Sequence, residues 1–293
     1  MAATTDDAAA PDGGGAPGWA SAPGGGGMPG EGGVPGGPEA GAAARTSPQL
    51  AAMPEGWTRA LAVVAHPDDL EYGVAAGIAE WTARGKQISY LLATRGEAGI
   101  DTMDPAEAAR VREGEQRASA AAVGVTDVRF LDHQDGVLQE GPALRSDIAA
   151  VIRALRPELV ITVNHRDTWG AAPGAPWNTP DHRALGRSVL DAVGDAGNRW
   201  IFTERMKKDG VGPWDGVRWV AVAATPAVTH AVEVGEEAAR KGLASLLEHR
   251  AYITALTDEE PEAYARSIVD RALDMYGQSY GGRRAVAFEL HPC

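Results

Sequence analysis

The sequence predicts an α/β domain in which helices cover both faces of a mainly parallel β-sheet. Two observations support this prediction. From about Thr58 onward, short runs rich in Val, Ile and Leu recur along the chain, and such continuous apolar runs are typical of strands buried on both faces of a parallel sheet. Longer segments with helical character lie between these runs, and a regular alternation of strand and helix indicates a parallel sheet.

Each expected element has a local signal. Residues 59–65 (RALAVVA) form the first apolar run, and residues 70–84 have helical character up to Gly85, which suits a helix C-cap. Pro157 ends a later helix, because proline cannot continue one. The further strands are expected over residues 86–94, 128–131, 159–163, 217–224 and 284–290, and the further helices over 105–123, 145–155, 182–193, 236–256 and 261–276.

The first 55 residues differ in composition from the rest of the chain. Gly, Pro and Ala dominate them, and such a segment buries too little apolar surface to offset the chain entropy lost on folding. We therefore expect a disordered tail over residues 1–55 and one domain over residues 56–293. A phosphate-binding loop is not expected in the tail, because no strand precedes its glycines and no Gly-Lys-Ser/Thr follows them.

Composition and charge exclude several kinds of partner. The 293 residues have a formal net charge of −13, so nucleic acid and anionic membrane surfaces are not expected partners. The N-terminus lacks the features of a secretion signal and no apolar run is long enough to span a bilayer, so a cytoplasmic location is expected. Cys293 is the only cysteine, which leaves no internal disulfide and no thiolate metal cluster. The sequence leaves homo-oligomerisation open.

Metal-ligating residue types follow two of the expected strands. The first strand ends in HPDD at residues 66–69, and the stretch after the fourth strand closes in DH at residues 181–182. Sites in such sheets form outside the carboxyl ends of the strands, so the two segments can meet. His66, Asp69 and His182 would then supply two imidazoles and a carboxylate and leave one position open, as at a catalytic zinc ion.

The local pattern also has a purely structural interpretation. Asp68 could cap the following helix, with Glu71 three residues later completing a capping box. However, a cap needs one carboxylate, whereas two stand here beside a histidine.

Five blocks resemble those of the LmbE/PIG-L superfamily of zinc-dependent N-deacetylases, and they occur in the family's order between about residues 59 and 198. They are AHPDDLEYG (65–73), TRGEAG (94–99), the Arg112/Glu115 pair in RVREGEQRASAAAVGV, LDHQDG (131–136) and PDHRALG (180–186). The C-terminal third is only loosely similar to the family. The resemblance implies a Rossmann-like three-layer sandwich and the hydrolysis of an N-acyl amide, expected to be N-acetyl, on a small amino sugar or a related metabolite.

The resemblance also implies roles for individual residues. Zinc would be bound by His66, Asp69 and His182, and Fe²⁺ is an alternative because N and O ligands do not strongly exclude it. Asp68 would be the general base that deprotonates the zinc-bound water. The products would be a free amine and a carboxylate.

One position departs from the family pattern. Many relatives carry a histidine where this chain has Thr179, and a threonine cannot supply a proton in the same way. His165, just beyond the fourth strand, is the first candidate for that catalytic role. Asp181 acting with a water is the second, although Asp181 otherwise suits a residue that orients its neighbours. The third explanation is an impaired or redirected enzyme.

Further polar and aromatic residues near the strand ends are candidates for substrate contact. Aromatic faces suit sugar rings, but Trp is also a frequent core residue. A charged residue here could equally form a scaffold ion pair, and the spacing of Arg112 and Glu115 on an expected helix favours a local pair. The candidate substrate-binding residues are Arg95, Glu97, Arg112, Asp135, Trp169 and Trp177.

Three other functions stay open. Two histidines and a carboxylate also form the facial triad of non-haem Fe(II) oxygenases, although those enzymes usually have all-β jelly-roll folds. A non-catalytic family member would keep the fold without the activity. Within the family, the sequence does not separate an amino-sugar deacetylase from a mycothiol S-conjugate amidase.

Overall fold

The apolar runs of the sequence form the strands of one sheet, in the order β1-β7-β8-β6-β5-β2-β3-β4. The computed structural model describes residues 49–293, so most of the tail expected over residues 1–55 lies outside the described residues. The strands are β1 (Ala51–Ala52), β2 (Arg59–Val64), β3 (Gln87–Leu92), β4 (Asp127–Phe130), β5 (Leu159–Val163), β6 (Trp219–Ala223), β7 (His230–Glu233) and β8 (Ala285–Pro292).

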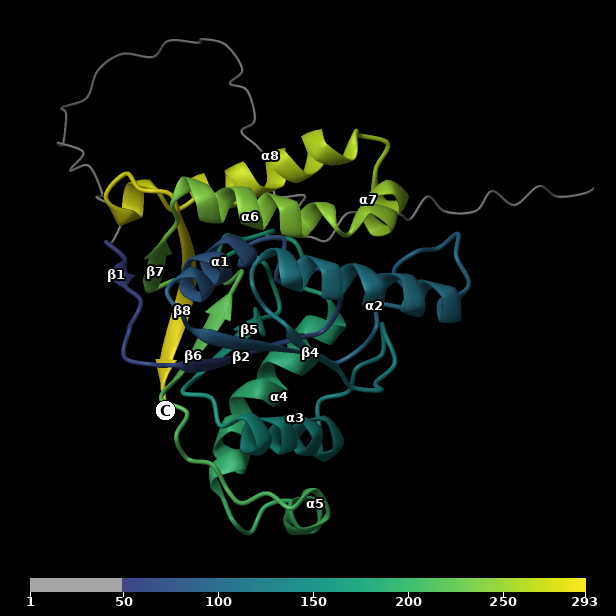
Figure 1. The fold of residues 1–293 in the computed structure, drawn as a ribbon, viewed down its shortest axis with the longest axis vertical. Helices are drawn as coiled ribbons and strands as arrows, with labels where there is room; N and C mark the ends of the chain where they lie inside the picture. The colour runs from purple at the N-terminus through teal and green to yellow at the C-terminus, as the bar shows by residue number, and fades with distance from the viewer. Residues whose placement is uncertain (1–48) are drawn as a thin grey trace, which may run out of the picture.

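Helices cover both faces of this sheet. Figure 1 shows α1, α2, α6, α7 and α8 on one side and α3, α4 and α5 on the other. Together with the mostly parallel strands, this confirms the predicted α/β class. The helices are α1 (Ala75–Ala83), α2 (Pro105–Ala122), α3 (Pro142–Leu155), α4 (Pro180–Gly197), α5 (Thr203–Asp209), α6 (Glu236–Leu247), α7 (Arg250–Leu256) and α8 (Pro261–Asp274). Within residues 49–293, no helix combines the length and apolar character that crossing a membrane requires.

The order of the strands reverses between β2 and β5. These two strands pair in parallel, with Ala60 opposite Leu159, while β3 and β4 extend the sheet on one side and β6 on the other. Every residue of β5 is buried, as expected for a strand covered on both faces. A crevice forms outside the carboxyl ends of the strands where the order reverses, and this is where ligands bind in open α/β sheets. The segments after β2 and β5 therefore lie together at this edge.

The segment after β2 is not helical where a helix was expected. Helix α1 begins at Ala75 instead of residue 70, and its N-cap Val74 makes no side-chain hydrogen bond. Asp68 has φ +92°, a value that non-glycine residues rarely adopt. Asp68 thus does not have a helix N-cap conformation, and Val74 is the N-cap of α1 instead. The interpretation of Asp68 and Glu71 as a capping box is therefore wrong.

The C-terminal part of the sheet also differs from the expectation. Strand β8 runs antiparallel to both β6 and β7, and β1 and β7 were not expected, because both are short and lack an apolar run. Pairing of β1 with β7 and burial of Met53 bring residues 51–53 into the folded domain, which thus begins before Gly56. Short helix α5 was missed as well, and the segment 236–256 is divided into α6 and α7 at Glu248 and His249.

Helix α4 packs closely on β5 through Gly186. A Cβ atom at this position would lie 2.8 Å from both Cβ of His165 and the carbonyl oxygen of Val163. We expect Gly186→Ala to push α4 from the sheet and to lower the free energy of unfolding by about 1–3 kcal/mol. Gly194→Ala, on the same helix but with no atom within 4 Å of its added Cβ, should instead stabilise by about 0.5–1 kcal/mol. Urea unfolding measures both, and equal effects would contradict close packing at Gly186.

Candidate active site

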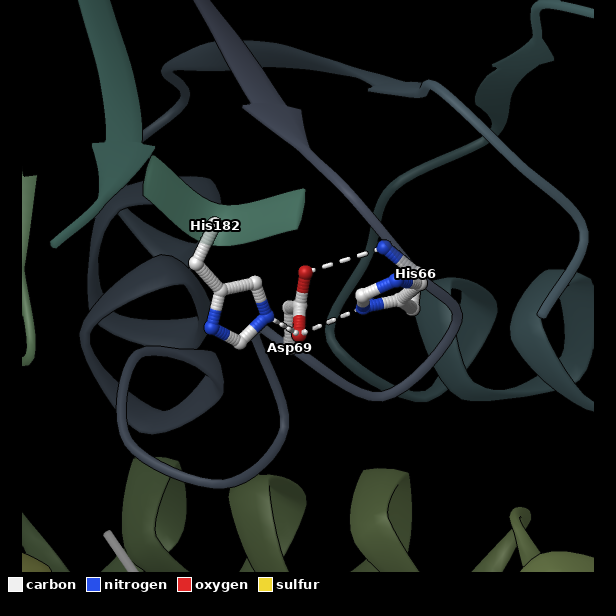
Figure 2. A group of neighbouring side chains, drawn as sticks. All are labelled: His66, Asp69 and His182. Carbon is white, nitrogen blue, oxygen red and sulfur yellow. Dashed lines mark hydrogen bonds and ion pairs between the residues drawn. The ribbon is translucent and has the colours of Figure 1, made fainter. Parts of the chain in front are cut away.

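The carboxylate of Asp69 joins the two segments that meet at the edge of the sheet. Its Oδ2 atom accepts hydrogen bonds from the backbone N–H groups of Ala65 and His66, each at 2.9 Å. Its Oδ1 atom lies 2.9 Å from Nε2 of His182 and 3.7 Å from Nδ1 of His66. Figure 2 shows the Asp69 carboxylate between the two imidazole rings. The backbone thus holds one oxygen and leaves the other facing both histidines.

His182 is positioned by the start of α4. Thr179 is the N-cap of this helix, and its hydroxyl accepts a hydrogen bond of 3.3 Å from the backbone N–H of His182. Pro180 follows at the first helical position, which proline favours. Thr179 therefore has a structural role that brings His182 to the site from the first turn of the helix.

His66, Asp69 and His182 together form a candidate metal site. One ligand atom from each lies within 4.8 Å of the others. The Asp69 and His182 side chains are buried, and that of His66 is largely so. Two imidazole nitrogens and one carboxylate oxygen are a donor set that catalytic zinc uses. The structure thus brings together the three residues that the sequence singled out as ligands.

Two further carboxylates surround the other nitrogen of His66. Its Nε2 lies 3.0 Å from Oδ1 of Asp135 and 3.1 Å from Oδ2 of Asp181. Asp181 is itself anchored, because its carboxylate accepts hydrogen bonds from the N–H groups of Gly136 and Leu138 at 2.7 and 3.0 Å. Carboxylates in this position orient an imidazole ligand. Here they turn Nδ1 of His66 toward Asp69.

The charges of this cluster shift one another's pKa values. Burial alone would lower the pKa of His66, but hydrogen bonds to Asp135, Asp181 and Asp69 raise it well above its usual value. Burial alone would raise the pKa of Asp69, but His182 and His66 outweigh that effect and lower it. The hydrogen bonds to carboxylates thus favour the charged form of His66, and the two histidines favour the charged form of Asp69.

Asp68 occupies a different environment from its neighbour Asp69. It is buried, its Oδ2 lies 3.2 Å from Nη2 of Arg112, and its backbone N–H donates to Oε1 of Gln116 at 2.9 Å. Burial raises the pKa of Asp68 to about 7, with Arg112 opposing the shift and Asp69 adding to it. The two adjacent carboxyl groups therefore differ strongly in their affinity for a proton.

A buried polar network behind Asp68 was not foreseen. Gln116 donates through Nε2 to Oε1 of Glu71 at 2.9 Å, and the Ser119 hydroxyl donates to the same oxygen at 2.7 Å. These bonds attach the loop after β2 to α2. Gln116 is four residues from Arg112 on one helix face, so helical spacing could have revealed it.

Arg112 and Glu115 do not form the expected local pair. Glu115 accepts from the backbone N–H of Ala251, while Arg112 is buried, donates to the carbonyl of Gly96 and stacks on the ring of Tyr252. The structure therefore places Arg112 where it holds the loop that carries Asp68.

Arg95 and Glu97 lie on the polar side of the site. Arg95 is partly exposed and pairs with Glu113 and Asp132 at 3.0 and 2.9 Å. Glu97 accepts a hydrogen bond of 2.9 Å from the backbone N–H of Asp135. Both line a shallow polar groove with a volume of about 340 Å³. Their scaffold bonds do not prevent contact with a ligand in this groove.

The two tryptophans of the loop after β5 lie differently. Trp169 has its ring 5.4 Å from that of His182, in an edge-to-face arrangement. Trp177 is 66% exposed, with the guanidinium of Arg183 5.2 Å from its ring. Buried Asn178 donates to two carbonyls of this loop and holds its ends together. Of these two tryptophans, only Trp169 contacts a candidate metal-ligating residue, His182.

His165 packs against α4 and is not grouped with the candidate metal ligands among the described residues. Its ring is 6.5 Å from that of His291, and its Cβ packs on Gly186 of α4. Burial and the neighbouring Arg166 lower its pKa. Within residues 49–293, two groups of side chains could hold a metal, and His165 belongs to neither: they are His66, Asp69 and His182, and His66, Asp135 and Asp181. The sequence could not show this, because only the packing of α4 decides where the residue after β5 points.

A cavity of about 300 Å³ opens beside Asp69 and His182. Trp169 and Pro176 of the loop after β5 line it, as do Met275 and Tyr276 beyond α8. Its lining thus includes residues from the C-terminal third, where sequence motifs gave no signal.

The chain is similar to known deacetylases. Residues 61–193 match the family model described as "PIG-L: GlcNAc-PI de-N-acetylase". The chain is 32% identical over 174 residues to a 1D-myo-inositol 2-acetamido-2-deoxy-alpha-D-glucopyranoside deacetylase of Kineococcus radiotolerans, covering 47% of this chain and 46% of the relative. It is 33% identical over 141 residues to diacetylchitobiose deacetylase of Thermococcus kodakarensis, covering 47% and 50%. The chain thus spans about half the length of these relatives.

The fold is also that of a solved deacetylase. N,N'-diacetylchitobiose deacetylase from Pyrococcus horikoshii superimposes with a TM-score of 0.69 at 21% identity, covering 81% of this chain and 85% of that one. The matched segment holds all three candidate metal ligands as well as Asp68. Residues 61–193 therefore form a domain of the PIG-L/LmbE family.

Proposed function

We propose that this protein is a metal-dependent amidohydrolase that removes the acyl group from the nitrogen of an amino sugar or a related small metabolite. The observation that carries the proposal is the convergence of His66, Asp69 and His182 beside the buried carboxyl group of Asp68. The names of the relatives support an N-acyl amide as the bond that is cleaved. The parallel α/β fold argues against the oxygenase alternative, which is associated with all-β folds.

The residues present fit a divalent cation. Oδ1 of Asp69, Nε2 of His182 and Nδ1 of His66 face one another, and each ligand is held from behind by the backbone, a helix start or carboxylates. The nitrogen and oxygen donors suit Zn²⁺, and Fe²⁺ is the second choice. When bound, such an ion supplies Lewis acidity, which lowers the pKa of water and polarises an amide carbonyl.

Asp68 is the proposed proton carrier. Its carboxylate accepts a proton from the attacking water, whose oxygen bonds to the acyl carbon, and then delivers that proton to the amide nitrogen as the C–N bond breaks. A pKa near neutrality suits a group that must both accept and donate a proton. Arg112 and Gln116 hold Asp68 in place. The leaving amine thus receives its proton without a histidine at Thr179, so neither His165 nor Asp181 is needed as the acid.

Loss of one ligand should abolish metal binding. We expect the wild-type protein to bind about one equivalent of zinc and His182→Ala to bind it more than about 100-fold more weakly, since even outer residues contribute 10–100-fold. His165→Ala is the matched control and should keep wild-type affinity. Competition with a chromogenic chelator measures both. Equal zinc affinity in the two variants would contradict the assigned ligand set.

Zinc affinity should fall with decreasing pH. Because hydrogen bonds to carboxylates raise the pKa of His66, this ring is protonated in the metal-free protein and must lose a proton to bind a metal. We expect affinity to weaken about tenfold per pH unit below that pKa. In Asp181→Asn the pH dependence should move to lower pH, because one charge that stabilises the imidazolium is gone. Titration calorimetry at several pH values measures this, and a pH-independent affinity would contradict it.

Removal of the proposed base should separate catalysis from metal binding. Asp68→Asn keeps a side chain that tolerates positive φ, so the loop should fold and zinc binding should persist. We expect kcat for N-acetylglucosamine hydrolysis to fall by roughly 10²–10⁴. The exposed Asp191→Asn on α4 serves as the control and should retain full activity. Unchanged kcat in Asp68→Asn, with zinc bound, would overturn the role of Asp68.

A further inference from the structure

We propose that the cavity beside Asp69 and His182 binds the acyl chain of the substrate, and that this chain is an apolar group of several carbons, larger than acetyl. The inference rests on the proposed function, because it takes the amide carbonyl to lie at the candidate metal ligands. It names the part of the substrate that the site selects.

Two of the candidate ligands and many apolar side chains line the cavity together. Asp69 and His182 are the ligands, and the remaining lining includes Val163, Trp169 and Met275. Alanines 223, 224, 272 and 287 complete much of the wall, and their small side chains leave the space open. A site that bound sugar hydroxyl groups would need several polar partners there, whereas this lining offers few.

The volume of the cavity exceeds what an acetyl group needs. It holds about 300 Å³, and a water molecule, which is about as large as a methyl group, occupies about 30 Å³ of liquid. An acetyl methyl would leave most of this apolar space without contacts. An acyl chain of several carbons would make contacts along more of this space.

The two sides of the site differ in polarity, as the two halves of an N-acylated amino sugar do. Arg95, Glu97 and Asp132 line the polar groove, and Glu97 accepts a hydrogen bond from the backbone of Asp135, whose carboxylate contacts His66. The apolar cavity lies toward Asp69 and His182. A substrate with its amide at the ligands can therefore place a hydroxyl-rich amine in the groove and an alkyl chain in the cavity.

One exposed apolar side chain belongs to the lining of the apolar cavity. Among residues 49–293, four large hydrophobic side chains are strongly exposed, and one of them lines this space. Met275, 59% exposed, lines the cavity directly, and Trp177 follows Pro176, which lines it too. Such exposure near a pocket is typical of a binding site for an apolar ligand.

The test is a series of N-acylglucosamines from acetyl through butyryl and hexanoyl to octanoyl, with the zinc-loaded enzyme. Each methylene that enters the cavity should raise kcat/KM about three- to fourfold, so hexanoyl should exceed acetyl on the order of a hundredfold. A second series keeps the N-acetyl group and lengthens an alkyl aglycone from methyl to octyl. A preference for acetyl, or a gain that follows the aglycone, would overturn the assignment.

A matched pair of substitutions on α8 locates the effect. Ala272 lines the cavity, so Ala272→Phe should fill it and lower the ratio of kcat/KM for the octanoyl substrate to that for the acetyl substrate by at least about tenfold. Ala263→Phe places the same side chain on the exposed face of the same helix and should leave the chain-length preference unaltered. Equal effects of the two substitutions would overturn the inference.

Binding of product acids distinguishes failure of this inference from failure of the proposed function. Octanoate should bind the metal-free and zinc-loaded protein more tightly than acetate, and Ala272→Phe should remove the difference. Hydrolysis of all N-acylglucosamines at equal rates would overturn the acyl assignment but leave the proposed function intact. Hydrolysis of none would overturn the proposed function, and equal binding of octanoate and acetate would then overturn the cavity's apolar role as well.

Discussion

The carboxylate of Asp69 is the contact on which the rest of the site depends. Its Oδ2 is held by the backbone where β2 ends, and its Oδ1 faces His182 from the start of α4. One side chain thus links the first strand of the parallel sheet to the helix that follows β5. Because β2 and β5 are neighbours at the point where strand order reverses, the link spans a short distance and needs no long flexible side chain.

Around this contact the protein gathers more negative than positive charge. Asp68, Asp135 and Asp181 join Asp69 near His66, and their side chains are largely buried. Buried charges are costly unless they are paired, and here the pairing leaves an excess of carboxylates. A divalent cation would remove that excess. Burial raises the pKa of Asp68 to about 7, with the charge of Asp69 adding to the shift, whereas His182 and His66 lower the pKa of Asp69.

The site also divides the space around the ligands by polarity. Loop residues after β3 and β4 contribute to the polar groove, whereas the loop after β5 and the segment beyond α8 contribute to the apolar cavity. Met275 reaches this cavity from a part of the chain that lies more than 200 residues after β2. In our proposals, the ligands and Asp68 provide the chemistry and these two regions select the substrate.

The sequence by itself determined the α/β class, the central strands and which three side chains come together as a candidate metal site, because buried strands are continuous apolar runs and the ends of neighbouring strands must meet. The tertiary structure alone decided what periodicity does not encode: the positive φ of Asp68, the antiparallel β8 and the packing of His165 against α4. Thr179 is a further example. The sequence shows a threonine at this position, but only the structure shows that α4 begins there and that Thr179 is its N-cap. Local signals determine what a segment can form, whereas packing between distant segments determines which side chains face the site.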